Sequence, residues 1–221
     1  MRKLIFITIV CAFVAAPVVA DPYAQFTGIG YAGSYNGYYV GEYLVKTWDL
    51  PDVHANGVQF YTFCIEFHEN VNWGTYYDAE ISTEAIAGNG NTGPTGPTGG
   101  DSLDPRSAWL YDQYQSGTLG LGLRSNPLAK DVGMAIWAIE DEIPYNDLSQ
   151  AQKDLISNAT TAGWTDTRDY RVLNLYALNS AHEGNPLNYR QDYIVKVPVP
   201  GAVLLGMLGF CVAGLKLRKS K

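Results

Sequence analysis

Residues 126–144, NPLAKDVGMAIWAIEDEIP, decide the architecture of the chain because they predict a helix that is apolar along one face. Asn126-Pro127 favours a helix start, since a proline at the first helical position has no backbone N–H to satisfy. Pro144 cannot continue a helix and predicts its end. The apolar side chains between them recur every three or four residues, the spacing of one buried face; they are Leu128, Val132, Ala135, Ile136, Ile139 and Ile143. We expect this face to pack against a sheet.

Two further helices are predicted on either side of this segment. Asp104 followed by Pro105 is a typical helix start, and Ser149 with Gln152 fits the capping-box pattern. Residues 170–178 are a candidate fourth helix.

Strand patterns lie on both sides of the helical region. Residues 23–46 are rich in tyrosine and glycine and predict short strands and turns, and residues 189–197 return to a strand pattern. The predicted fold class is therefore α+β: a β-sandwich or barrel-like sheet with a helical insertion.

The clearest single strand is predicted for residues 58–68. Alternation along it places Cys64, Glu66 and His68 on one face. This grouping admits a thiol nucleophile beside a base, although no oxyanion site is visible. The alternative is a half-buried cysteine next to surface polar groups.

Three short motifs of residues 25–196 resemble those of bacterial thioester domains: Phe63-Cys64-Ile65-Glu66, Ala108-Trp109-Leu110-Tyr111 and Met134-Ala135-Ile136-Trp137. In that family a cysteine and a glutamine form an internal thioester that surface nucleophiles on a host attack. The resemblance places the cysteine at Cys64 and the glutamine, four residues before Trp137, at Gly133. Glycine has no carboxamide, so a thioester cannot form with this position. We therefore expect a thioester-domain-like fold with Cys64 as a free thiol.

The C-terminal residues 197–221 form a three-part tail. A proline-rich motif is followed by an apolar run of the shortest length that spans a bilayer and then by basic residues; the motif and cations are Val197, Pro198, Val199, Pro200, Gly201, Ala202, Lys216, Arg218 and Lys219. The tail resembles the PEP-CTERM sorting signals of bacteria that secrete exopolysaccharide. This resemblance implies processing by an exosortase at the inner membrane. The alternative is an ordinary C-terminal membrane anchor.

The N-terminus has the pattern of a signal peptide, residues 1–20. Arg2 and Lys3 precede an apolar run, and the small residues up to Ala20 suit cleavage before Asp21. The expected partners are the Sec translocon and signal peptidase. The expected exported domain is residues 21–196, destined for the cell surface or extracellular matrix, and Cys64 is its single cysteine.

Charge narrows the possible partners of this domain. The chain has formal net charge −7, and removing its two N-terminal and four C-terminal basic residues leaves −13. Nucleic acid is disfavoured, because phosphate binding needs clustered cations. No metal site or cofactor is expected, since the three histidines lack metal-ligand spacing and no calcium-type loop is present. Glu140-Asp141-Glu142 predicts a solvated turn, with a bound cation or partner as the alternative.

These features predict an exported protein without catalytic activity that serves a structural or adhesive role in the envelope or the exopolysaccharide matrix. One alternative is a covalent adhesin in which Cys64 forms its acyl bond with another residue. The other is a glycan-binding module that stacks sugars on the tyrosine-rich strands, which loss of sugar binding on Tyr38→Ala would reveal.

Overall fold

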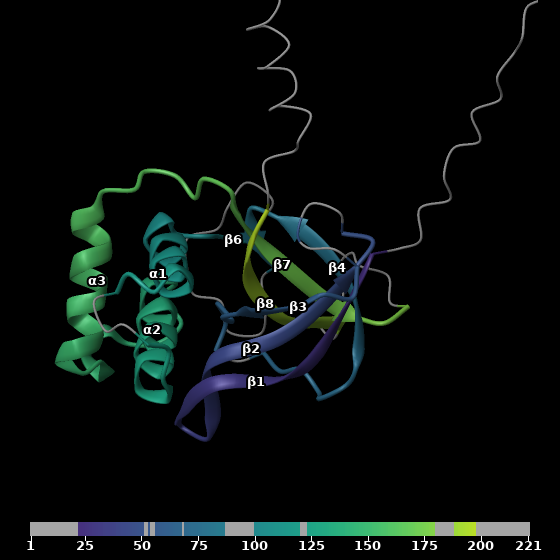
Figure 1. Ribbon diagram of the computed structural model, residues 1–221, viewed down its shortest axis with the longest axis horizontal. Coiled ribbons are helices and arrows are strands. Elements are labelled where there is room, and N and C mark those ends of the chain that lie inside the picture. Colours follow the sequence, from purple (N-terminus) through teal and green to yellow (C-terminus); the bar gives the residue numbers. More distant parts are fainter. Residues whose placement is uncertain are drawn as a thin grey trace, which may run out of the picture.

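The computed structural model describes residues 22–50, 53, 56–67, 69–86, 100–119, 123–179 and 188–197. They form a large antiparallel sheet with three α-helices beside it (Figure 1). The predicted signal peptide and the sorting motif from Pro198 onward lie outside these residues. Within the described ranges, no helix combines the length and the apolar character needed to cross a membrane.

The main sheet has six antiparallel strands in the order β3-β2-β1-β4-β7-β8. Their bounds are β1 Tyr23–Tyr35, β2 Tyr38–Trp48, β3 Gln59–Thr62, β4 Tyr76–Ser82, β7 Tyr170–Ala177 and β8 Tyr189–Lys196. A separate pair of two-residue strands, β5 Glu84–Ala85 and β6 Asp101–Ser102, lies outside the main sheet.

The first two strands form one long hairpin of 13 and 11 residues rather than several short strands. Asn36 and Gly37 make its turn with φ angles of 49° and 88°. Two consecutive residues with positive φ give the turn type whose twist matches that of the flanking strands, and Asn-Gly is its preferred sequence.

The sheet closes on itself because the chain beyond β3 reaches β8. Cys64 forms an isolated antiparallel bridge with Tyr193. The Ile65 amide donates to the Asp192 carbonyl and the Ile194 amide to the Phe63 carbonyl, each at 3.0 Å. The result agrees with the barrel-like alternative of the prediction. The strand predicted for residues 58–68 is therefore only four residues long, followed by this bridge, and His68 lies outside the described residues.

The helices are α1 Pro105–Ser116, α2 Asn126–Ile139 and α3 Gln150–Ala162. The predicted helix starts are confirmed: Asp104 caps α1, and Ser149 with Gln152 forms a complete capping box on α3. The α2 helix packs on β1 and β2 and contacts the other two helices (Figure 1). Its predicted apolar face is buried, with Val132, Ala135 and Ile136 fully inaccessible.

Residues 170–178 form strand β7, so the prediction of a fourth helix is wrong. Six of the eight residues in β7 are buried, because the strand is covered on both faces. Burial on both faces removes the alternation of apolar and polar residues by which a strand is recognised.

A buried carboxylate ties the hairpin to the helical region. Glu42, fully buried in β2, accepts hydrogen bonds from the Tyr114 hydroxyl at 2.6 Å and the Tyr31 amide at 2.8 Å. Arg124 forms an ion pair with the same carboxylate, and its guanidinium carbon lies 4.0 Å from the centre of the Tyr61 ring. Strands β1, β2 and β3, helix α1 and the segment before α2 therefore meet at one side chain.

Candidate functional site

The closure of the sheet sets the position of Cys64. Its bridge to Tyr193 places it opposite strand β8, and its side chain is 2% exposed. Gln191 lies two residues before Tyr193, and although β8 has a register shift between Arg190 and Tyr193, a side-chain hydrogen bond places the two side chains on the same side of the strand. The Gln191 side chain is 5% exposed, and its Oε1 accepts a hydrogen bond of 3.1 Å from the Tyr193 hydroxyl. A buried thiol and a buried carboxamide therefore share one face of the closed sheet.

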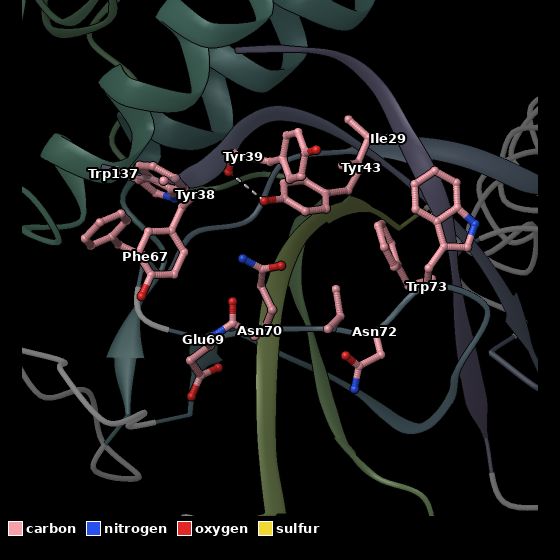
Figure 2. Close-up of a pocket in the computed structure, with 14 residues that line it drawn as sticks. Ile29, Tyr38, Tyr39, Tyr43, Phe67, Glu69, Asn70, Asn72, Trp73 and Trp137 are labelled. Atoms are coloured by element: carbon pink, nitrogen blue, oxygen red, sulfur yellow. Dashed lines mark hydrogen bonds between the residues drawn. The ribbon is translucent and has the colours of Figure 1, made fainter. Parts of the chain in front are cut away.

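The Tyr43 hydroxyl links these two groups. Burial raises the pKa of Tyr43 well above its ordinary value, the neighbouring Cys64 raises it further, and a hydrogen bond with Gln191 lowers it. The hydroxyl also donates to the backbone oxygen of Tyr39 at 2.9 Å (Figure 2). Tyr43 thus lies near both Cys64 and Gln191, while its hydroxyl proton is engaged by the Tyr39 carbonyl.

The structure contains Cys64 as a free, buried thiol. Burial raises its pKa to about 12, while the Tyr43 hydroxyl and the Trp137 indole beside the sulfur oppose the rise. The thiolate is the reactive form of cysteine, so this thiol is a poor nucleophile towards reagents in solution. Its reactivity depends on groups placed against it within the fold.

A pocket of about 390 Å³ opens next to this pair, lined by Gln191, Tyr43 and Trp137. Its walls are largely aromatic, with Tyr39 and Trp73 at the outer part, 63% and 68% exposed (Figure 2). The side chains of Glu69, Asn70 and Asn72 supply polar atoms on one side; the remaining lining residues are Phe26, Ile29, Gly37, Tyr38, Phe67 and Val71. The pocket gives solvent and small groups a route to the Gln191 carboxamide.

The structure brings the three sequence motifs together around residues 63–67. The Phe63 ring meets the Tyr111 ring edge-on at 6.3 Å between centroids, and the Phe67 ring lies 5.1 Å from that of Trp137. Tyr111 and Trp137 therefore hold the segment that carries Cys64.

The space around Gly133 is filled by strand β2 and leaves no room for a side chain. A Cβ atom on Gly133 would stand 2.7 Å from Val40 Cγ2 and 3.1 Å from the amide nitrogen of Gly41. Glycine at this position allows helix α2 to approach strand β2 closely. The expectation that a glutamine side chain at position 133 would lie beside Cys64 therefore meets a steric obstacle.

We expect Gly133→Gln to lower the free energy of unfolding by about 1–3 kcal/mol, because overpacking outweighs the roughly 1 kcal/mol gained by removing glycine from a helix. Urea unfolding measures the change. Adding Val40→Ala should recover part of the loss, since it removes the methyl group that the new Cβ would meet. An unchanged unfolding midpoint for Gly133→Gln would contradict this packing.

Three buried carboxylates lie directly beside the Cys64–Gln191 pair. Ligand atoms of Glu66, Glu69 and Asp192 are all within 4.8 Å of one another. Burial and the neighbouring carboxylates raise the pKa of Glu66 to about 11, and burial raises that of Glu69 to about 8. These three side chains are the described residues best placed to hold a metal ion.

The acidic turn after α2 also differs from its prediction. Glu140 is 6% exposed and accepts a hydrogen bond from the Asp104 amide at 3.3 Å, and Glu142 accepts one from the Phe67 amide at 3.0 Å. These two side chains point inward, where they accept hydrogen bonds from the backbone amides of Asp104 and Phe67, which lie outside the helices and strands and need acceptors. The expectation of a solvated turn is therefore wrong for Glu140 and Glu142.

Gln191 is a candidate site residue that none of the sequence motifs indicates. The signal that identifies it is the strand pattern of residues 189–197, which places Gln191 and Tyr193 on one face. Only the pairing of β8 with residues 63–65, more than 120 positions away, reveals that it lies near Cys64. Two other glutamines, Gln113 and Gln115, use their side-chain amides for other hydrogen bonds: Gln113 donates to the Asp112 carboxylate and Gln115 to the Tyr61 carbonyl.

No protein-family model matches the sequence, and no curated protein matches it. Two solved structures are similar to the domain, and both belong to the family that the motifs resemble. The N-terminal thioester domain of a surface protein from Clostridium perfringens is 15% identical, with a TM-score of 0.46 over 79% of this chain and 97% of that one. The N-terminal thioester domain of the fibronectin-binding protein SfbI from Streptococcus pyogenes is 16% identical, with a TM-score of 0.43 over 84% and 97%.

Proposed function

We propose that the chain is an exported cell-surface adhesin in which Cys64 and Gln191 form an internal thioester. The observation that supports this function is the placement of a buried thiol and a buried carboxamide on paired segments of the closed sheet, with Tyr43 near both. The proposal replaces Gly133 with Gln191 as the acyl position and so favours covalent adhesion over an inert Cys64.

Thioester formation needs no external reagent. The Cys64 sulfur adds to Cδ of Gln191, the C–S bond forms, the C–N bond breaks and ammonia leaves. The thiol proton goes to the departing nitrogen. The indole N–H of Trp137 is buried without an oxygen acceptor among the described residues. A donor of this kind stabilises the oxyanion that develops on the carbonyl.

The adhesive step is an acyl transfer to a nucleophile that enters the pocket. An amine attacks Cδ of residue 191, an amide bond forms, the C–S bond breaks and the proton passes to the Cys64 sulfur. The thioester is consumed once in each molecule, so the protein is not an enzyme with turnover. The pocket beside Gln191 admits a nucleophilic side chain, and the low exposure of Cys64, which does not line the pocket, limits contact of the sulfur with water.

Intact-mass analysis of the natively exported protein tests the thioester. We expect a mass lower than the calculated one by one ammonia, and a gain of one methylamine after treatment with that amine. Cys64→Ser and Gln191→Ala should each abolish both changes, whereas the exposed control Gln150→Ala should retain them.

A protein that keeps its full mass and takes up an alkylating reagent at Cys64 after denaturation would contradict the thioester. The aromatic pocket would then favour the glycan-binding alternative, which Tyr38→Ala tests on a sugar array.

We propose further that the tail sorts the protein through an exosortase to the cell surface or the exopolysaccharide matrix. Support comes from the order of the proline-rich motif, the short apolar run and the basic end in residues 197–221. The mature form isolated from its native host should therefore lack Leu217 to Lys221 in the same mass measurement. Retention of these residues would instead favour a plain membrane anchor.

A further inference from the structure

We propose that Glu66, Glu69 and Asp192 bind a divalent cation, with calcium as the favoured ion, beside the Cys64–Gln191 pair. The three carboxylates come from two parts of the chain and bring ligand atoms within 4.8 Å of one another. All three side chains are buried, with exposed fractions of 4%, 8% and 1%. This site goes beyond the proposed thioester and does not depend on it.

The side chain of Glu66 is the second, separate indication of a ligand. It is 96% buried, and no donor group in the described part of the chain reaches either of its carboxylate oxygens, whose neighbour is the Glu69 carboxyl. One oxygen of Glu69 is likewise buried without a partner. Buried polar groups are almost always satisfied, and an unsatisfied carboxylate costs more free energy than a neutral group. Three oxygens directed into a shared space therefore call for a positively charged occupant.

Asp192 supplies the fixed part of the site. Its Oδ2 accepts a hydrogen bond from the Ile86 amide at 2.8 Å and its Oδ1 one from the Leu175 amide at 3.3 Å. Each oxygen keeps a second lone pair for a cation. The side chain is thus oriented before any ion binds.

The ligand set identifies the class of ion. All candidate ligands are carboxylate oxygens, which suit calcium or magnesium rather than zinc or copper. Calcium accepts six to eight oxygens at flexible angles and binds carboxylates in bidentate mode, whereas magnesium requires a near-ideal octahedron. Two glutamates with four oxygens between them, completed by Asp192 and water, fit calcium better. Glu69 also lines the 390 Å³ pocket, which gives an ion a route from solvent.

The rival occupant is a proton shared between Glu66 and Glu69. Two carboxyl groups in contact commonly keep one proton, and the raised pKa values of both groups in the absence of an ion are consistent with this state. The basic side chain of Arg190 offsets part of this charge, since it lowers the pKa of Glu69. Glutamine at position 66 reproduces the protonated carboxyl in shape and charge, so it separates the two occupants.

The experiment measures thermal unfolding of the exported protein, first stripped with EGTA and then titrated with calcium chloride. We expect Tm to rise by roughly 5–10 °C once calcium exceeds its Kd about 100-fold. Glu66→Gln should lose this rise, and Asp154→Asn, an acid-to-amide change on the exposed face of α3, should keep it. Cys64→Ser should also keep it, which separates failure of this site from failure of the thioester.

Terbium luminescence provides a second measurement, and it uses the unmodified protein, so it does not require that any variant folds. Tyr193 follows Asp192 in the chain and Trp137 lines the same pocket as Glu69, so we expect these rings to sensitise bound terbium and calcium to displace the signal. The cation site is refuted if neither calcium nor EGTA changes Tm, or if Glu66→Gln responds as the unmodified protein does. The first outcome would favour the shared proton as the occupant, and the second would place the cation at another site.

Discussion

Replacing Ile136 by aspartate is expected to unfold the domain. Ile136 lies in the middle of α2, is fully inaccessible, and belongs to the face that packs on β1 and β2. Aspartate there would leave a carboxylate without a partner and remove the apolar contacts. The cost is several kcal/mol, comparable to the roughly 5–15 kcal/mol by which a whole domain is stable.

Circular dichroism during a thermal melt measures this effect. The control is Ala151→Asp, at an exposed position in the first turn of α3, where a negative charge favours the helix dipole. The control should melt within a few degrees of the unmodified protein. An unchanged melting midpoint for Ile136→Asp would mean that this face of α2 does not pack on the sheet.

The second large effect is expected for Glu42→Ala. The change removes the acceptor for the Tyr114 hydroxyl and the Tyr31 amide, and it leaves the Arg124 guanidinium without its ion-pair partner. The Glu42 carboxylate occupies the space where a side chain at position 30 would lie, since a Cβ on Gly30 would collide with Glu42 Oε2. Alanine at position 42 would leave this space empty. Removal of one partner from a buried ion pair costs about 3–5 kcal/mol.

Glu80→Ala is the matched control for this substitution. Glu80 is an exposed glutamate on β4 whose carboxylate accepts a hydrogen bond of 3.1 Å from the Tyr176 hydroxyl. Its loss should lower the free energy of unfolding by roughly 1 kcal/mol or less. Urea unfolding of both variants tests the difference, and equal losses would show that Glu42 does not join the hairpin to the helices.

The helices were largely predictable from the sequence because their signals are local. Capping residues, prolines and apolar spacing all lie within one or two turns of the helix that they define. The ends were less accurate: α2 ends at Ile139, five residues before Pro144, since Glu140 and Glu142 turn inward to bind backbone amides. A proline sets an upper limit on a helix but does not fix its last residue.

The site was only half predictable, because its two halves are distant in sequence. Cys64 is conspicuous as the single cysteine of residues 21–196, whereas Gln191 becomes significant only when β8 pairs with residues 63–65. The motif that contains Met134 to Trp137 places the family's glutamine at Gly133. In the structure, a side chain at position 133 would meet Val40 rather than the Cys64 sulfur. The pairing of β8 with residues 63–65 and the close approach of α2 to β2 at Gly133 leave no local pattern in the sequence.

The position of Gln191 in the last described strand determines how the domain would carry mechanical load. In the proposed adhesin, a ligand bonded to Gln191 and a cell attached beyond Val197 would pull on opposite ends of a six-residue stretch of β8. Tension would then run along this short stretch instead of through the hairpin, α1 or α2. Strand β8 is hydrogen-bonded to β7 on one side and to residues 63–65 on the other, so the load would shear several hydrogen bonds together rather than open them one at a time.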